Sequence, residues 1–104
     1  MPGQQGPYRI NLAEEAIEQA ERLGRGDAKK YKKLQKALQH LRDDPKYPGL
    51  HAHKWDVLKG KAPDGGDVWT AYVENRTPSA WRIFYYFPRN EPGRITILSI
   101  GPHP

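Results

Sequence analysis

The sequence lacks cysteine altogether, and its 104 residues include only one methionine and two phenylalanines. The lack of cysteine excludes disulfide bonds and thiolate metal sites, and it is consistent with a reducing compartment. No apolar run approaches the roughly 18 residues that a membrane-spanning helix needs. Residues 1–6 show no basic stretch followed by an apolar one, which is the pattern of a secretion signal. We therefore expect a cytoplasmic protein.

Acidic residues are also scarce relative to basic ones. The chain has 12 Asp and Glu against 17 Lys and Arg, which gives a formal net charge of +5. This balance favours a polyanionic partner such as nucleic acid, an anionic membrane surface or an acidic protein. Hydrophobic residues make up 37% of the chain, enough for a folded domain. The length predicts a single domain over residues 7–104, preceded by a flexible leader at residues 1–6.

The first part of the domain predicts a short strand followed by a helix. Residues 8–12 alternate between apolar and polar side chains, as a strand with one buried face does. Asn11 is a suitable helix N-cap, and Glu14 stands three residues later, as in a capping box. Apolar residues recur at near-helical spacing over residues 12–23, and Gly24 suits the position just after a helix end. We therefore predict a helix over residues 12–23.

A second helix is predicted to begin at Gly26–Asp27 and to stop before Asp44–Pro45. Its apolar stripe consists of Tyr31, Leu34, Leu38 and Leu41, and its other side carries Lys29, Lys30, Lys32, Lys33 and Lys36. Because only a few residues join the two helices, they should form an antiparallel hairpin. The lysine-rich side is either a solvated surface or an electrostatic contact with RNA or an acidic partner.

The remainder of the chain predicts a loop followed by antiparallel strands. Residues 45–66 are rich in loop-forming residues, with one short strand predicted around 55–58. Longer strands are predicted at 68–74, 81–87 and 95–100, separated by turns. The predicted fold class is therefore α+β, with an N-terminal strand and a helical hairpin packed on an antiparallel sheet of three or four further strands.

Arg82 is the most unusual polar residue, because it lies inside the most apolar predicted strand. By the period of two along a strand, it shares a face with Phe84 and Tyr86. A guanidinium on a half-buried strand must find an anion or open water, since an unpaired buried charge is costly. One interpretation is a salt bridge to Glu74 or Asp56, or an exposed position. The other interpretation is that the guanidinium binds a phosphate, because two of its N–H donors can bond to two phosphate oxygens at once.

Titratable groups also concentrate in the segment 51–61 and at His103. His51 and His53 have H-x-H spacing but no third ligand nearby, so a loop pair is the better interpretation, and we expect no metal and no cofactor. Asp56 by itself is a weak signal, because a lone carboxylate in a loop is usually a cap or a turn residue. His103 lies between two prolines that restrict its backbone, and the alternative there is a frayed chain end.

These residue types permit metal-free cleavage of RNA by internal attack of its 2′-OH. That reaction needs a base to remove the 2′ proton, an acid to protonate the leaving 5′ oxygen, and cations to stabilise the charged phosphorane. Histidine, aspartate, lysine and arginine can supply these roles. The sequence contains no Gly-rich phosphate loop, Ser-His-Asp spacing or zinc-protease motif. The residues are therefore compatible with RNA cleavage, but they do not distinguish it from other functions.

The strand Trp81–Tyr86 and the stretch Ile95–His103, following a strand and two helices, resemble the RelE/ParE superfamily of toxin–antitoxin toxins. The likeness runs from about Tyr8 to His103. RelE-type members are ribosome-dependent endoribonucleases that cut mRNA in the ribosomal A site, whereas ParE-type members poison DNA gyrase on a similar fold. The resemblance to the YoeB-like branch implies a metal-independent endoribonuclease. Its partners would be mRNA on the ribosome and a cognate antitoxin, with no membrane partner.

The resemblance also implies roles for individual residues. Arg82 matches the strand arginine that contacts the scissile phosphate. His103 matches a histidine that acts as an acid or a base, roles that suit histidine because it gains and loses a proton near neutral pH. Asp56 matches an acidic residue that serves as a base or orients another group. The residues expected to bind RNA are Lys54, Lys59, Lys61, His51, His53 and Tyr86.

The sequence departs from the family pattern at two places. Pro104 stands where a tyrosine often follows the histidine, and residues 69–74 contain none of the lysines that some RelE members carry on the middle strand. Two alternative functions stay open. One is a ParE-like inhibitor of DNA gyrase, and the other is a catalytically inactive module of the same fold that binds RNA or protein.

Overall fold

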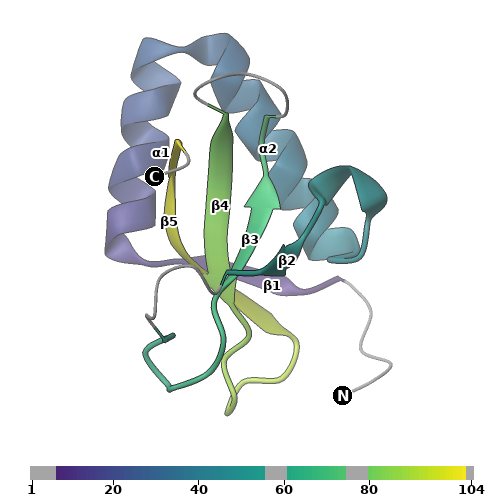
Figure 1. Cartoon of the computed structure of the whole chain (residues 1–104). Helices are drawn as coiled ribbons and strands as arrows, with labels where there is room; N and C mark the ends of the chain where they lie inside the picture. The colour runs from purple at the N-terminus through teal and green to yellow at the C-terminus, as the bar shows by residue number, and fades with distance from the viewer. Residues whose placement is uncertain (1–6, 56–60, 75–79, 103–104) are drawn as a thin grey trace.

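A computed structural model describes residues 7–55, 61–74 and 80–102 of the chain. In chain order its elements are β1 (Arg9–Leu12), α1 (Glu14–Gly26), α2 (Ala28–Asp43), the 3₁₀ helix η1 (Pro48–Leu50), β2 (His53–Lys54), β3 (Trp69–Tyr72), β4 (Trp81–Tyr86) and β5 (Arg94–Pro102). This order confirms the predicted α+β fold (Figure 1).

The five strands form one sheet in the order β1-β5-β4-β3-β2. The pairs β3–β4 and β4–β5 are antiparallel, as the sequence predicted. The pair β2–β3 is also antiparallel, but β2 lies at His53–Lys54, before the predicted strand around 55–58, most of which lies outside the described residues. The edge strand β1 instead pairs in parallel with the first part of β5, so the sheet is mixed. This order places β4 at the centre, with β5 on one side and β3 on the other.

Helix α1 begins later and ends later than the sequence predicted. Asn11 is not its N-cap, because Asn11 belongs to β1 and pairs with Thr96 of β5. The cap position is taken by Ala13, whose side chain makes no capping hydrogen bond. At the other end, the helix continues through Gly24 to Gly26. Strand pairing therefore overrides the local capping signal here.

Helix α2 begins and ends where the sequence predicted. The Asp27 side chain accepts a hydrogen bond from the Lys30 backbone N–H at 3.0 Å, which satisfies one of the free donors at the helix start. The helix ends at Asp43, just before Pro45. The two helices form the predicted hairpin and cover one face of the sheet, lying behind it in Figure 1. Among the described residues, neither helix is long and apolar enough to cross a membrane.

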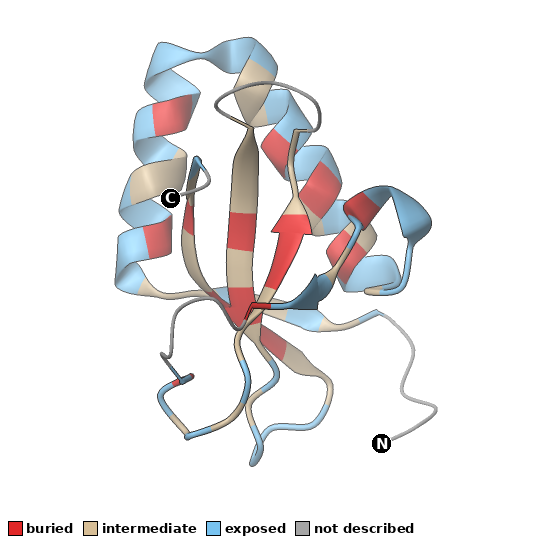
Figure 2. Ribbon diagram, in the orientation of Figure 1, coloured by how far each residue is buried: buried red, intermediate tan, exposed pale blue. Residues whose placement is uncertain are grey.

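Alternation along β4 separates the helix-covered face of the sheet from the opposite face, which we call the open face. Ile83 and Tyr85 are 0% and 1% exposed and belong to the core between sheet and helices. The residues between and beside them are half-buried and point to the open face, and these are Arg82, Phe84 and Tyr86. Figure 2 shows the corresponding buried positions on both helices and on β3 and β4. Truncating Ile83 to alanine should therefore cost about 2–5 kcal/mol of stability.

The last strand contains an irregularity that keeps its apolar residues in the core. Ile95, Ile97 and Ile100 are all essentially unexposed, although the last two are three residues apart. A register shift opposite Phe84 and Tyr85 absorbs the extra residue. Because of this bulge, the side chain of Ile100 points to the same face of the sheet as those of Ile95 and Ile97. Beyond the bulge, Gly101 lies directly opposite Arg82.

Candidate functional site

Arg82 is placed at the centre of the open face by the strand register. It lies opposite Tyr72 of β3 on one side and opposite Gly101 of β5 on the other. Directly opposed residues of neighbouring strands share a face of the sheet. A Cβ atom added to Gly101 would meet no atom of the described residues within 4 Å. Arg82 therefore has an aromatic ring opposite it on β3 and a residue without a side chain opposite it on β5.

Tyr72 holds the guanidinium of Arg82 in place. The Arg82 Nη2 donates a hydrogen bond to the Tyr72 hydroxyl oxygen at 3.3 Å, and Cζ lies 4.3 Å from the Tyr72 ring centroid. A guanidinium over an aromatic face is favourable by about 0.5–1 kcal/mol at exposed sites, and by more where water is excluded. The contact also restricts a side chain that would otherwise lose much rotamer entropy on binding a ligand.

Among the described residues, the one side-chain hydrogen bond of Arg82 is that from Nη2 to Tyr72. Its Nε is buried and has no hydrogen-bond partner among the residues that the structure describes. Glu74, one of the carboxylates considered as a partner, instead accepts ion pairs from Lys30 at 3.4 Å and from Lys33 at 3.5 Å. The other, Asp56, lies outside the described residues. An arginine held in place with no carboxylate partner among these residues is suited to an anion that accepts more than one hydrogen bond.

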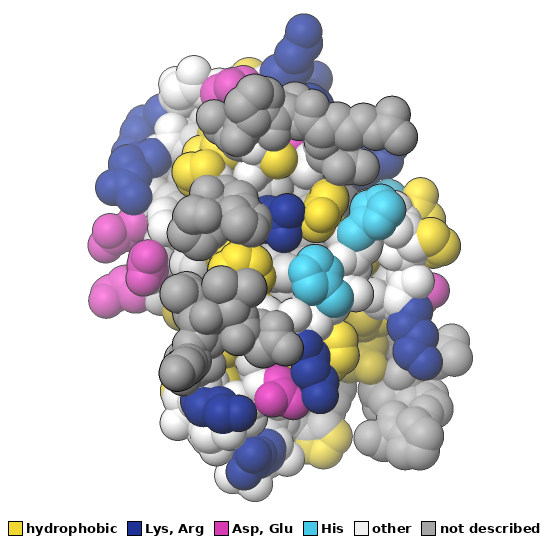
Figure 3. All heavy atoms as spheres, viewed as in Figure 1, with side chains coloured by type: hydrophobic (Ala, Val, Ile, Leu, Met, Phe, Trp, Pro, Cys, Tyr) yellow, Lys and Arg dark blue, Asp and Glu magenta, His cyan; other side chains and the backbone are white. Residues whose placement is uncertain are grey.

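Two histidines stand beside this pair. The His51 ring centroid lies 5.0 Å from that of Tyr72, so that Tyr72 has His51 as one ring neighbour and Arg82 as another. Figure 3, viewed from the open face, shows two histidine side chains beside a basic side chain near the middle of the molecule. Both His51 and His53 are exposed. His51 lies at the end of η1, as a loop position predicts, whereas His53 belongs to β2.

A hydrogen bond to His51 defines the tautomer of neutral His53. Its Nδ1 lies 2.8 Å from the backbone oxygen of His51. A carbonyl oxygen can only accept, so Nδ1 must carry the hydrogen, and Nε2 of the neutral ring is left as the acceptor. Nε2 of His53 is therefore free to exchange a proton or to accept a hydrogen bond.

His51 has an uncommon backbone conformation. Its φ of 48° and ψ of 40° are left-handed, and among the described residues no other non-glycine has a positive φ. This conformation costs a residue with a Cβ about 1–2 kcal/mol. It ends η1 and turns the chain toward β2, which brings the His51 ring to Tyr72. Strain of this kind is more frequent at functional positions than elsewhere.

Two aromatic side chains, Trp55 and Phe84, pack together next to Arg82 on the open face. The Trp55 and Phe84 rings meet edge to face with centroids 5.2 Å apart. Trp55 is 9% exposed, and Thr70, which lies opposite Phe84 on β3, is 0% exposed. Trp55 therefore covers part of the open face and lowers the water content beside Arg82, which strengthens charge interactions there.

The predicted site residues fall into three groups. The structure brings Arg82, His51 and His53 to the open face, and Tyr86 lies on the same face of β4. Lys54 and Lys61 are exposed and both pair with Asp67, at 3.4 Å and 3.8 Å. Asp56, Lys59 and His103 lie outside the described residues, and their roles remain predictions.

Sequence reasoning missed Tyr72 and Gly101. Neither carries a motif, and their proximity to Arg82 depends on the pairing of β3 and β5 with β4. The alternation of β3 would have placed Tyr72 on the same face as Thr70. It could not have shown which residue of β4 lies opposite. Within the described ranges, no three His, Asp or Glu side chains gather closely enough to hold a metal ion.

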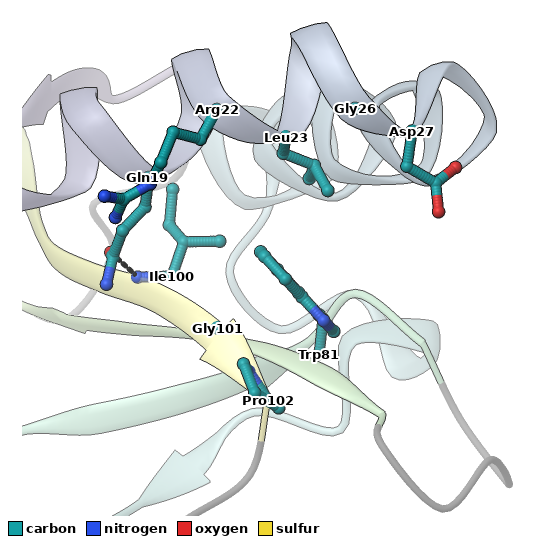
Figure 4. Close-up of a pocket in the computed structure, with 9 residues that line it drawn as sticks. All are labelled: Gln19, Arg22, Leu23, Gly26, Asp27, Trp81, Ile100, Gly101 and Pro102. Atoms are coloured by element: carbon teal, nitrogen blue, oxygen red, sulfur yellow. Dashed lines mark hydrogen bonds between the residues drawn. The ribbon is translucent and has the colours of Figure 1, made fainter.

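A separate hollow lies on the other face of the sheet. Its volume is about 380 Å³, and it is enclosed by α1 and the ends of β4 and β5 (Figure 4). Trp81, Ile100 and Leu23 give it mostly apolar walls. The Gln19 side-chain oxygen accepts a hydrogen bond from the Ile100 backbone N–H at 2.6 Å, beyond the point where β1 stops pairing with β5. Side chains alternate between the two faces along a strand, so Trp81, which lines this hollow, and Arg82 point to opposite faces of the sheet. The hollow is therefore not part of the Arg82 site.

Comparison with known proteins supports the fold. No protein-family model matches the chain, and no curated protein matches it. A YoeB/ParE toxin from Agrobacterium tumefaciens superposes with a TM-score of 0.69 at 17% identity, covering 92% of this chain and 99% of that one. A YoeB dimer from Staphylococcus aureus gives 0.63 at 17% identity, covering 95% and 100%.

YoeB in a heterotetrameric complex with YefM, also from Staphylococcus aureus, gives a TM-score of 0.62 at 17% identity and covers 93% of this chain and 98% of that one. All of these matches extend over nearly the whole of both chains. The protein therefore has the fold of the YoeB and YoeB/ParE toxins. This confirms the fold that the sequence resemblance implied.

Proposed function

We propose that this protein is the toxin of a toxin–antitoxin system, and that it is an endoribonuclease that cleaves mRNA on the ribosome without a metal ion. The observation that carries the proposal is the position of Arg82 and the contacts of its guanidinium. Arg82 lies at the centre of the open face, is held by Tyr72, and has no carboxylate partner among the described residues. A phosphodiester is the anion that the net charge of +5 favours.

In this proposal the RNA supplies its own nucleophile. A base removes the proton of the 2′-OH, the 2′ oxygen forms a bond to phosphorus, and the bond from phosphorus to the 5′ oxygen breaks. An acid gives the 5′ oxygen a proton, so the products are a 2′,3′-cyclic phosphate and a 5′-OH. Arg82 stabilises the additional negative charge of the phosphorane, a contribution worth about 10²–10³ in rate for one well-placed donor.

The acid and the base in this proposal are His103 and Asp56, with Lys59 adding positive charge near the phosphate. His51 and His53 provide a second pair of groups on the open face, and Nε2 of His53 is the atom available for proton exchange. Proton transfer by positioned groups contributes about 10²–10⁴ in rate. Lys54 and Lys61 would contact the RNA backbone by exchanging Asp67 for phosphate, an exchange favoured because their ion pairs are exposed.

The proposal includes a cognate antitoxin. The Staphylococcus aureus structures of the same fold include YoeB bound to its antitoxin YefM. An acidic segment would suit the basic side of α2 and the positive net charge of this chain. Binding would protect the host cell until the antitoxin is removed.

Expression of the wild type beside Arg82→Ala and His103→Ala tests the proposal. We expect the wild type to arrest growth and to cut translated mRNA, and both variants to lose at least about 100-fold of the cleavage rate. If the wild type leaves mRNA intact, the endoribonuclease is excluded. If it also blocks supercoiling by purified gyrase, the gyrase inhibitor replaces it. Full activity of both variants would retain the function but overturn the site.

A further inference from the structure

A second hollow adjoins the Arg82 site across Tyr72. Its volume is about 260 Å³, and it lies between α2, the η1 segment and the end of β3. Tyr72 is a wall of this hollow and also holds the Arg82 guanidinium. Tyr72 is therefore shared by the hollow and the Arg82 site. The volume is below the roughly 300–1,000 Å³ of pockets for whole drug-sized ligands, which suits one unit of a longer ligand.

The α2 wall of this hollow is basic. Lys33, Lys36 and His40 line it from one side of α2, at the spacing that places residues of a helix on one face. Lys33 is partly engaged, because its Nζ lies 3.5 Å from a carboxylate oxygen of Glu74. Within the described residues Lys36 has no ion-pair partner, and it is exposed. Lys36 is therefore a cation available to an anionic ligand.

Tyr47 extends the α2 wall by stacking on His40. The rings of His40 and Tyr47 stack with centroids 4.0 Å apart and planes within 6° of each other. Tyr47 is 41% exposed, so one of its faces packs on His40 while much of the ring remains accessible. Gly49 makes room for this ring, because a Cβ at that position would lie 2.7 Å from Tyr47 Cε2. An exposed large aromatic side chain beside a free cation is the arrangement that binds a base and its phosphate together.

We infer that this hollow is a nucleotide subsite for single-stranded RNA, in which a base stacks on Tyr47 and a phosphate lies at Lys36. The subsite receives the nucleotide that flanks the phosphate at Arg82. This inference rests on the proposed function for the identity of the bound strand. The Tyr47 ring favours RNA over an acidic peptide, because a peptide needs only the cations and gains nothing specific from a stacked ring.

The test is binding of a fluorescent single-stranded RNA oligonucleotide with a 2′-O-methyl group on every ribose, which cannot be cleaved by 2′ attack. We expect Tyr47→Ala to weaken binding about tenfold and Tyr47→Phe to retain it, because stacking on an aromatic ring is lost only in the first. Lys36→Ala should weaken binding and reduce the salt slope by about one. Lys32→Ala, an equal charge change on α2 outside the hollow, is the matched control and should have a smaller effect.

Equal losses for Lys36→Ala and Lys32→Ala, or full binding by Tyr47→Ala, would overturn the subsite, as would a wild type that does not bind the oligonucleotide. Loss of antitoxin affinity with RNA binding unchanged would assign the hollow to the antitoxin instead. The outcome is separable from the proposed function, because binding is measured without cleavage. If the Tyr47 and Lys36 effects occur in a protein that cuts no mRNA, the subsite is retained and the endoribonuclease is rejected.

Discussion

Arg82 on β4 and Gly101 on β5 lie directly opposite each other on the open face of the sheet. Gly101 has no side chain, and a Cβ there would meet no atom of the described residues within 4 Å. On its other side, the Tyr72 ring lies 4.3 Å from Arg82 Cζ. The sheet therefore holds the guanidinium from the β3 side, and β5 places no side chain directly opposite it.

The first prediction concerns the space at Gly101. Gly101→Val should fold, because valine suits a strand and nothing described occupies the space. It should reduce mRNA cleavage by about 10–100-fold, since the branched side chain would occupy the place of the substrate phosphate. Gly101→Ala is the matched control and should lose less. Cleavage rates and urea unfolding of both variants provide the measurement, and unchanged cleavage by Gly101→Val would show that no ligand uses this space.

The second prediction concerns the support that Tyr72 gives to Arg82. Tyr72→Phe removes the 3.3 Å hydrogen bond but keeps the ring under the guanidinium, so we expect a loss of only a few-fold in cleavage. Tyr72→Ala removes both and should cost about 10–100-fold, because a poorly positioned catalytic group is far less effective. The effect should appear in the cleavage rate at saturating substrate. Equal losses in the two variants would assign the support to the hydroxyl alone.

The third prediction concerns the left-handed backbone of His51. His51→Gly and His51→Ala both remove the ring that packs on Tyr72. Only the glycine variant relieves the positive φ of 48°, so it should be more stable than the alanine variant by about 1–2 kcal/mol. Chemical denaturation of the two variants measures this difference directly. An alanine variant as stable as the glycine variant would mean that the chain leaves this conformation when the ring is removed.

The fourth prediction concerns pH. The Asp64 carboxylate accepts hydrogen bonds from the backbone N–H groups of Arg89 and Gly66, both at 2.9 Å. These bonds, that to Arg89 first, lower the pKa of Asp64 below its ordinary value of 3.8. A lowered pKa in the folded state stabilises the fold above the unfolded-state pKa, and this contribution is lost as the pH falls through the folded-state value.

Asp64→Asn should therefore be less stable than the wild type at neutral pH, and the difference should shrink as the pH falls below about 4. Urea unfolding of both proteins at neutral and acidic pH measures it. Asp67→Asn is a suitable comparison, because the Asp67 carboxylate is held by exposed lysine pairs rather than by backbone donors. A stability difference for Asp64→Asn that stays constant down to acid pH would contradict the role of these bonds.

Strong local patterns were sufficient to predict most of the elements. The strand predicted over 81–87, the helix start at Gly26–Asp27 and the stop before Pro45 each depend on neighbouring residues, and the structure confirms all three to within about one residue. The Asn11 cap was wrong because the same residue pairs with Thr96, more than eighty positions away, and that contact has no local signal. The parallel pairing of β1 and β5 was missed for the same reason.

The sequence by itself determined that Arg82 shares a face of its strand with Phe84 and Tyr86, because side chains alternate along a strand. It also determined the positive charge that favours a polyanionic partner. Only the tertiary structure decided that Tyr72 and Gly101 lie beside Arg82. Register between strands is set by pairing across the whole sheet and by the bulge in β5, and no short stretch of sequence contains that information.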